Sequence, residues 1–125
     1  MSPHQYVLQH LAKAEEFLDA ARANLAAAHV NAATSNAVLA GINAKDAICV
    51  FLVGGSVKSR NHDDAVEELR RVGDVGRELA PTLQRLLQLK NTSQYTNVSV
   101  SARDGHDAVR WATRLVEGAT RKVRG

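Results

Sequence analysis

The chain has 125 residues, of which 45% are hydrophobic and 23% are charged, so it suits one folded domain over residues 1–125 and is not a disordered chain. Its formal net charge is +3, and the basic excess lies in residues 101–125, which carry six Lys/Arg against three Asp/Glu. Cys49 is the single cysteine, which excludes an internal disulfide and favours a reducing, cytoplasmic location.

Two features of the first half bear on location. The N-terminal sequence lacks a basic segment followed by an apolar one, so no signal peptide is expected. The longest strongly apolar stretch, residues 37–53, contains Asn43, Lys45 and Asp46. We therefore expect it to be too short and too polar to span a bilayer, and we expect no membrane contact.

Apolar residues recur at helical spacing along most of the chain. A first helix is predicted over residues 3–28, with one apolar stripe and Pro3 in its first turn. A second helix is predicted from an Asn31 N-cap to Val53 and is ended by Gly54. Its apolar residues point in all directions, which is typical of the central helix of a bundle.

The second half contains shorter periodic segments. Asn61 predicts the cap of a third helix over residues 62–72, and Pro81 predicts the start of a fourth. The stretch "NTSQYTNVSV" is expected to be a frayed helix end and a loop, before a fifth helix that starts at Ser101 with Asp104 in a capping box. Short connections between such helices predict an all-α fold, an antiparallel bundle of four to five helices.

The second helix carries polar residues in one sector. Asn36, Asn43 and Asp46 fall within roughly 80° at about 100° per residue. A buried carboxylate needs a partner, and the predicted partners of Asp46 are His62 and Lys90. Two interpretations stay open: a structural network that sets helix register, or part of a functional cleft.

The segment around Lys90 supports both interpretations. Lys90 and Gln94, like Asn91 and Tyr95, are four residues apart and share a helix face if the helix extends that far. Lys90 and Tyr95 have the side-chain types that bind a phosphate or a ribose. The same types also form buried bridges with a tyrosine hydrogen bond.

His62 stands at the start of the third helix, where the positive end of the helix dipole disfavours a protonated imidazole and Asp63 and Asp64 oppose that effect. A neutral imidazole can act as a base, but a lone histidine at such a junction is more often structural. No metal site is predicted, because the histidines and carboxylates lack the spacing of known metal motifs.

The predicted fifth helix separates apolar from basic residues. Arg103, Arg110, Arg114 and Arg121 fall at roughly 200–240° from Ala108, opposite the apolar side. The stripe is either a solvated face, partly neutralised by Asp107 and Glu117, or a track that binds phosphates. With few aromatic residues to stack bases, reading of a single-stranded sequence is not expected.

Three segments together resemble the small HEPN-domain (higher eukaryotes and prokaryotes nucleotide-binding) proteins of actinobacteria and their phages. They are "AATSNAVLAGINAKDAICVFLVGGSVKSRNHDDAVEELRR", "LLQLKNTSQY" and "DAVRWATRLVEGA", and the resemblance covers nearly the whole chain. It implies an all-α bundle, commonly dimeric. Many members are ribonuclease toxins or defence components.

The family motif is an arginine, four to six residues and then a histidine, which meet near a dimer interface. His62 stands at the histidine's place, whereas no arginine occurs from Gly54 to Lys58, and Arg60 is only two residues before His62. By resemblance, His62 would be the general acid or base of a metal-independent ribonuclease, with Lys58 or Arg60 stabilising the phosphorane. Asp46, Lys90, Tyr95, Arg110 and Arg114 are the candidate nucleotide- or phosphate-binding residues.

The resemblance implies a homodimer that acts on RNA or a nucleotide and needs no cofactor. The alternative is a non-catalytic interaction module that binds a protein partner, such as an antitoxin-like or phage accessory protein. In that alternative the polar residues around Asp46 and His62 form a purely structural network.

Overall fold

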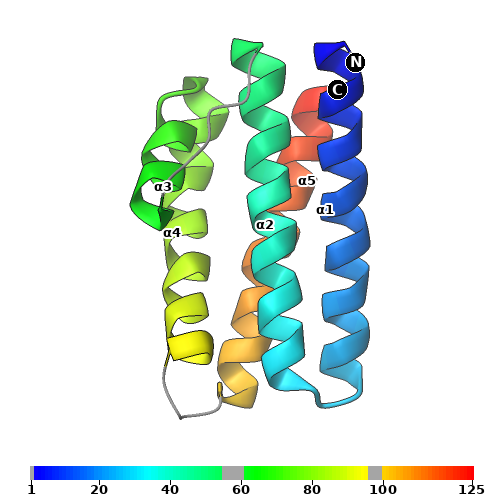
Figure 1. Ribbon diagram of the computed structural model, residues 1–125, viewed down its shortest axis with the longest axis vertical. Helices are drawn as coiled ribbons and strands as arrows, with labels where there is room; N and C mark the ends of the chain where they lie inside the picture. Colours follow the sequence, from blue (N-terminus) through cyan, green and yellow to red (C-terminus); the bar gives the residue numbers. More distant parts are fainter. Residues whose placement is uncertain (1, 55–60, 96–99) are drawn as a thin grey trace.

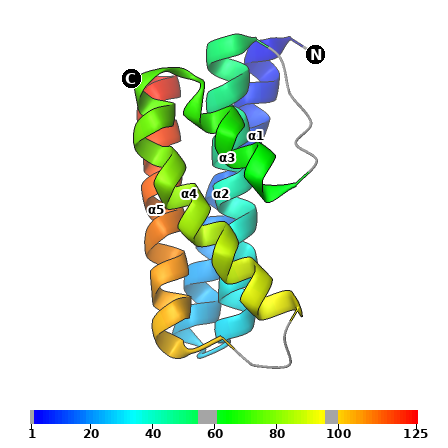
Figure 2. The same cartoon turned by 90° about the vertical axis from the view of Figure 1, so that its left-hand side faces the viewer.

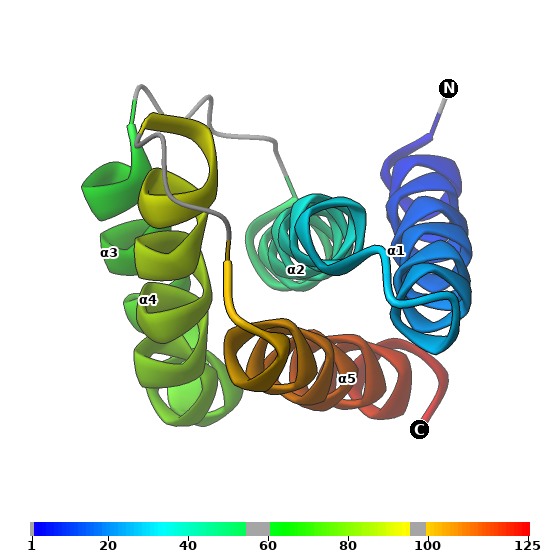
Figure 3. The same cartoon turned by 90° about the horizontal axis from the view of Figure 1, so that it is seen from below.

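The structure, a computed structural model, describes residues 2–54, 61–95 and 100–125, except the side chains of His62 and of residues 91–95. Its five helices are α1 (Pro3–Ala26), α2 (Val30–Val53), α3 (His62–Arg70), α4 (Gly73–Tyr95) and α5 (Ala102–Arg124). Seen from the end in Figure 3, α2 is surrounded by α1 on one side, α5 below and α4 on the other side, with α3 outside α4. The described residues contain no strand, and the predicted all-α bundle is confirmed.

The first two helices form an antiparallel hairpin (Figure 1). Ser2 and Gln5 cap α1 reciprocally, and Pro3 lies at its start as predicted. The predicted apolar stripe is buried from Val7 to Ala21. The helix ends at Ala26 rather than residue 28, because Ala28 adopts a left-handed φ of 63° in the turn to α2.

The N-cap predicted for α2 is wrong. The helix starts at Val30 after His29, which makes no side-chain cap. Asn31 is instead inside the first turn, and its Oδ1 accepts a hydrogen bond from the backbone N–H of Val100, 3.1 Å away. The side chain of Asn31, which the local sequence predicts as a helix cap, thus forms a tertiary hydrogen bond with Val100. The C-terminal end is as predicted, at Gly54 with a φ of 74°.

The predicted obstacle to membrane crossing also needs correction. Within the described part of the chain, α2 alone is long and apolar enough, by length and composition, to span a bilayer. More than half of its most apolar segment is nevertheless buried inside the bundle, as in the core helix of a globular protein.

The fourth helix starts eight residues earlier than predicted, at Gly73, so Pro81 lies inside it. Proline in a helix loses one backbone hydrogen bond and costs about 3 kcal/mol. Here α4 buries Leu79 before the proline, and Leu83 and Leu86 after it, while Pro81 faces solvent. The burial of these leucines on both sides of Pro81 offsets the cost of the lost hydrogen bond. A sequence pattern does not contain the amount of burial, so it could not predict this outcome.

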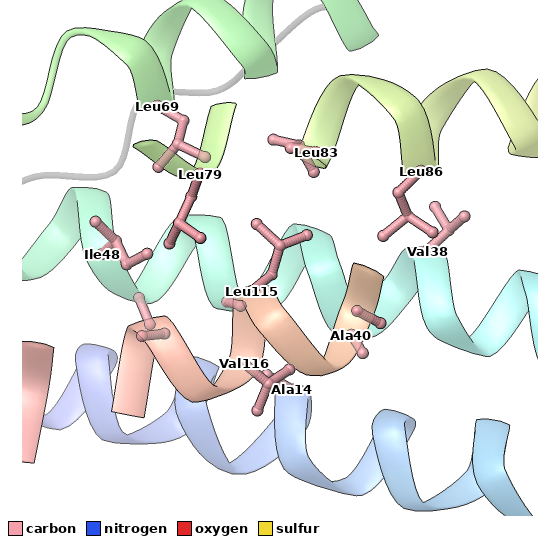
Figure 4. Packing of buried hydrophobic residues seen from close by; sticks show 14 of the residues in the cluster. Ala14, Val38, Ala40, Ile48, Leu69, Leu79, Leu83, Leu86, Leu115 and Val116 are labelled. Carbon is pink, nitrogen blue, oxygen red and sulfur yellow. The ribbon is translucent and has the colours of Figure 1, made fainter. Parts of the chain in front are cut away.

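The core joins all five helices. Figure 4 shows Ile48 and Val38 of α2 facing Leu79, Leu83 and Leu86 of α4, with Leu115 of α5 beneath them.

Short α3 packs mainly on α4 (Figure 2), where Gly76 lies against the carbonyl oxygen of Leu69. On α5, Ser101 Oγ accepts a hydrogen bond from the backbone of Asp104, the half of the predicted capping box that the structure shows.

Candidate functional site

A buried ion cluster links α2 to α3. The side chain of Lys45 is only 2% exposed, and its Nζ lies 3.1 Å from Oδ1 of Asp46 and 3.0 Å from Oε2 of Glu68. The carboxylates are 28% and 12% exposed respectively. Lys45 is therefore held by one acid on its own helix and one on α3.

The cluster gives Asp46 a partner that the sequence interpretation did not name. Asp46 forms an ion pair with its neighbour Lys45, while its predicted pairing with His62 stays a prediction because that side chain lies outside the described residues. The ion pair between Lys45 and Glu68 links the two helices. The sequence offered one signal, since Lys45 lies within a run of alanines and β-branched residues, where an unpaired lysine would be costly.

The charges around Lys45 determine its protonation. Burial opposes the ammonium, but the carboxylates of Asp46 and Glu68 outweigh burial and raise the pKa of Lys45. Cys49, one turn further along α2, is buried and free. Burial raises the pKa of the Cys49 thiol to about 12. The Lys45 ammonium opposes this rise, and the carboxylates of Glu68 and Asp46 add to it. The cysteine is thus an inert core residue, as its apolar context predicted.

The other polar residues of the predicted α2 sector face α1. The amide of Asn36 donates to Asn24 Oδ1 at 2.7 Å, and Asn43 Oδ1 lies 3.3 Å from His10 Nδ1. The residues of this sector therefore have two different roles. The two asparagines form contacts between α1 and α2, whereas Asp46 forms an ion pair with Lys45. For Asn36 and Asn43 the structural interpretation is sufficient.

Several predicted site residues lie outside the described residues. These are Lys58, Arg60 and the side chains of His62 and Tyr95. The proximity predicted for Asp46 and His62 therefore remains a prediction. Helix α4 does continue to Tyr95, so the four-residue relation between Lys90 and Gln94 falls on a helix, and Lys90 is half-buried there.

The predicted arginine stripe is confirmed as a geometrical feature. Arg103, Arg110, Arg114 and Arg121 are all exposed on α5, opposite its buried face. Arg110 pairs with Asp107 at 2.9 Å, as the predicted partial neutralisation requires. For the other three arginines, the structure shows no ion pair with a described residue.

The C-terminal end of the stripe borders an open groove between α4 and α5. The groove has a volume of about 250 Å³ and is lined by Val75, Glu78, Leu79, Gly118, Arg121 and Lys122. Gly118 lets α4 approach, because a Cβ atom there would lie 2.7 Å from Leu79 Cδ1. The predicted stripe includes Arg121 of this groove, but not Lys122, which lies about 100° from Arg121 around α5. It also does not include Glu78, which comes from a different helix.

A metal centre has no support in the described part of the molecule, where no three His, Cys, Asp or Glu side chains gather. Two arrangements of cations stand out in this part: the buried Lys45 cluster and the exposed arginines of α5. The first suits structural positioning of α3, and the second suits contact with an anionic polymer.

Comparison with known families agrees with the helical architecture. The model of the HEPN domain matches residues 7–122, a range that includes most of α1, all of α2 to α4 and nearly all of α5. Among curated proteins the chain has no match. HEPN domains are all-α bundles of a nucleotide-associated, ribonuclease-like family. The extent of the match shows that this chain belongs to the HEPN-domain family.

Proposed function

We propose that the protein binds RNA through the phosphate backbone, along the exposed arginine stripe of α5. The observation that carries the proposal is the one-sided placement of Arg103, Arg110, Arg114 and Arg121 on a helix whose opposite face is buried. Guanidinium groups match phosphate oxygens in charge and geometry. Membership of a nucleotide-associated family supports a nucleic-acid partner over a merely soluble face.

Base recognition is not part of this proposal. Only 4% of the residues are aromatic, and Trp111 on α5 is partly buried against the core. Stacking platforms of the kind that read single strands therefore have few side chains to build on. Binding should depend weakly on sequence and strongly on salt.

A binding titration tests the proposal. Labelled single-stranded RNAs of equal length and different sequence are titrated with protein at two salt concentrations. We expect retained complexes at the lower salt, with similar affinities for all sequences, and a steep loss at the higher salt. If no complex forms even at the lower salt, the stripe is a solvated surface and the proposal is wrong.

A second candidate function is metal-independent RNA cleavage. It rests on family membership and on the place of His62, the first residue of α3, whose preceding Asn61 caps the helix through the backbone of Asp64. In this function His62 is the general acid or base, and Lys58 or Arg60 supports the phosphorane. A toxin or defence role would follow, and the rival is a non-cleaving interaction module.

Incubation of defined RNAs with EDTA separates these versions. Wild-type protein should cleave and His62→Ala should not, while His106→Ala, which changes an exposed histidine of α5, should cleave normally. Equal cleavage by all three proteins would indicate a contaminating nuclease. Absence of cleavage by the wild type would favour the interaction module.

We further propose a homodimer that covers the open side of α2. In Figure 3 this side lies between α1 and the α3–α4 pair, with no helix over it. On α2, Leu39 is 41% exposed, and Ile42 is only partly buried. A two-fold contact would cover both residues in both copies. Sedimentation should show a dimer that Leu39→Lys dissociates. A wild-type monomer at high micromolar concentration would contradict the proposal.

A further inference from the structure

The groove between α4 and α5 differs from the rest of the arginine stripe in its charges. Along α5 the stripe presents single arginines, separated by a turn or more. At the groove, Arg121 and Lys122 are adjacent, so two cations line one hollow. Figure 2 shows this part of α5 beside the first turns of α4, at the same end of the bundle as the C-terminus.

The opposite wall of the groove comes from α4. Glu78 supplies one carboxylate, and Val75 and Leu79 supply apolar surface. The described residues provide no ion pair for Glu78, Arg121 or Lys122, although all three side chains are exposed. Two cations and one carboxylate therefore face a space of about 250 Å³, somewhat smaller than drug-sized pockets of roughly 300–1,000 Å³.

These charges distinguish an end of a strand from its interior. An internal phosphodiester carries one negative charge, whereas a terminal phosphomonoester carries about 1.5 to 2 near pH 7. Two adjacent cations suit the more highly charged group. Glu78 would repel a further phosphate in the groove, but it can accept hydrogen bonds from ribose hydroxyls. The apolar wall can contact the sugar. Because a further phosphate is repelled, the RNA strand would have its terminal nucleotide in the groove.

We infer that the α4–α5 groove binds the terminal phosphomonoester of an RNA strand whose backbone lies along the α5 stripe. The inference rests on the proposed backbone binding and adds a preference for one kind of strand end. Arg121 and Lys122 bind the phosphate, and Glu78 accepts from the adjoining ribose. The groove thereby sets the register of the strand on the stripe.

The test uses the full chain and one RNA sequence in three forms: with a 5′-phosphate, with a 3′-phosphate and with hydroxyls at both ends. We expect one phosphorylated form to bind roughly three- to tenfold more tightly than the hydroxyl form, the scale of two exposed ion pairs. If the 5′-phosphorylated form binds more tightly, the 5′ end of the RNA lies in the groove; if the 3′-phosphorylated form does, the 3′ end lies there. The competitor is inorganic phosphate, which should reduce this preference.

Matched variants locate the effect. Arg121→Gln/Lys122→Gln should abolish the preference, whereas Arg103→Gln/Arg110→Gln, with the same loss of charge, should weaken all three RNAs equally.

The outcomes separate this inference from the proposed function. If all three RNAs bind equally to the wild type, or if Arg121→Gln/Lys122→Gln keeps the preference, the groove is not an end-binding site, while backbone binding stands. If none of the RNAs binds, backbone binding fails and the inference fails with it. Circular dichroism of each variant should show unchanged helix content, because the substituted side chains are exposed.

Discussion

The ammonium of Lys45 on α2 lies 3.0 Å from the Glu68 carboxylate on α3, and this pair joins a nine-residue helix to the centre of the bundle. Helix α3 contacts α4 more extensively than it contacts α2. The ion pair therefore gives α3 a specific position against α2. Because α3 begins at His62, the same pair helps to position the residue that we propose as the general acid or base.

Replacing Lys45 by methionine should destabilise the fold strongly. The variant keeps an unbranched side chain that is one atom shorter than lysine, but it leaves Glu68 and Asp46 without the ammonium. Breaking a buried pair in this way costs about 3–5 kcal/mol, and we expect the lower end because Asp46 retains some solvent contact. Urea unfolding followed by circular dichroism measures the loss.

Two variants control for this effect. Lys13→Met removes an exposed lysine of α1 and should change the free energy of unfolding by less than about 0.5 kcal/mol. The double variant Lys45→Met/Glu68→Leu should recover much of the lost stability, because an apolar pair replaces a largely buried carboxylate that has lost the Lys45 ammonium. If Lys45→Met unfolds at the wild-type urea concentration, the cluster contributes nothing to stability.

Stability should fall in alkaline solution. The folded-state pKa of the Cys49 thiol is about 12, against 9.0 in its reference state, so above pH 9 the unfolded chain loses this proton first. The raised pKa of Lys45 acts in the same direction: its contribution is complete below 10.5 and is lost as pH rises through the folded value. Thermal unfolding from pH 7 to pH 11 should show a decreasing Tm.

Cys49→Ala tests the origin of that decrease. The variant should show a shallower decline between pH 9 and the region where Lys45 titrates, although its Tm at pH 7 is somewhat lower through the lost packing. Native Cys49 should react with an aromatic disulfide reagent only after unfolding, because the thiol is buried. Identical slopes for the two proteins, or fast reaction of the native thiol, would assign the alkaline effect elsewhere.

Gly76→Ala should disturb the junction of α3 and α4. A Cβ atom at this position would overlap the backbone carbonyl oxygen of Leu69, which cannot rotate away as a side chain can. Overpacking typically costs about 1–3 kcal/mol, and the gain in helix propensity of about 1 kcal/mol offsets part of it. Gln84→Ala, on the exposed side of α4, is the control and should be neutral. Wild-type stability of Gly76→Ala would show that the junction is loosely packed.

The salt dependence of RNA binding should report the number of arginines that meet phosphates. Contacts from all four arginines of the stripe imply a log–log slope of roughly −3 to −4. Arg110→Gln/Arg114→Gln should reduce the magnitude of that slope by about one to two. Arg22→Gln/Arg71→Gln loses the same charge on α1 and at the end of α3, and should keep the wild-type slope. Equal slopes for the two double variants would mean that net charge, not the stripe, governs binding.

The amino-acid sequence by itself determined the helical class, the ends marked by Asn61 and Gly54, and the division of α5 into a buried and a basic face. These features depend on local periodicity and capping, which act within a few residues of each other. For the same reason the exposure of Arg103, Arg110, Arg114 and Arg121 could be predicted before any packing was known.

Only the tertiary structure decided which polar groups meet. Lys45 of α2 forms its ion pair with Glu68 of α3, which lies more than twenty residues further along the chain. Asn31 accepts a hydrogen bond from the backbone of Val100 and does not cap α2. Pro81 lies inside α4 because the burial of leucines on either side of it offsets the free-energy cost of a proline in a helix interior. Glu78 joined Arg121 and Lys122 in one groove through the antiparallel packing of α4 on α5. Such pairings depend on burial across helices, where desolvation and packing energies exceed the local preferences that a sequence pattern expresses.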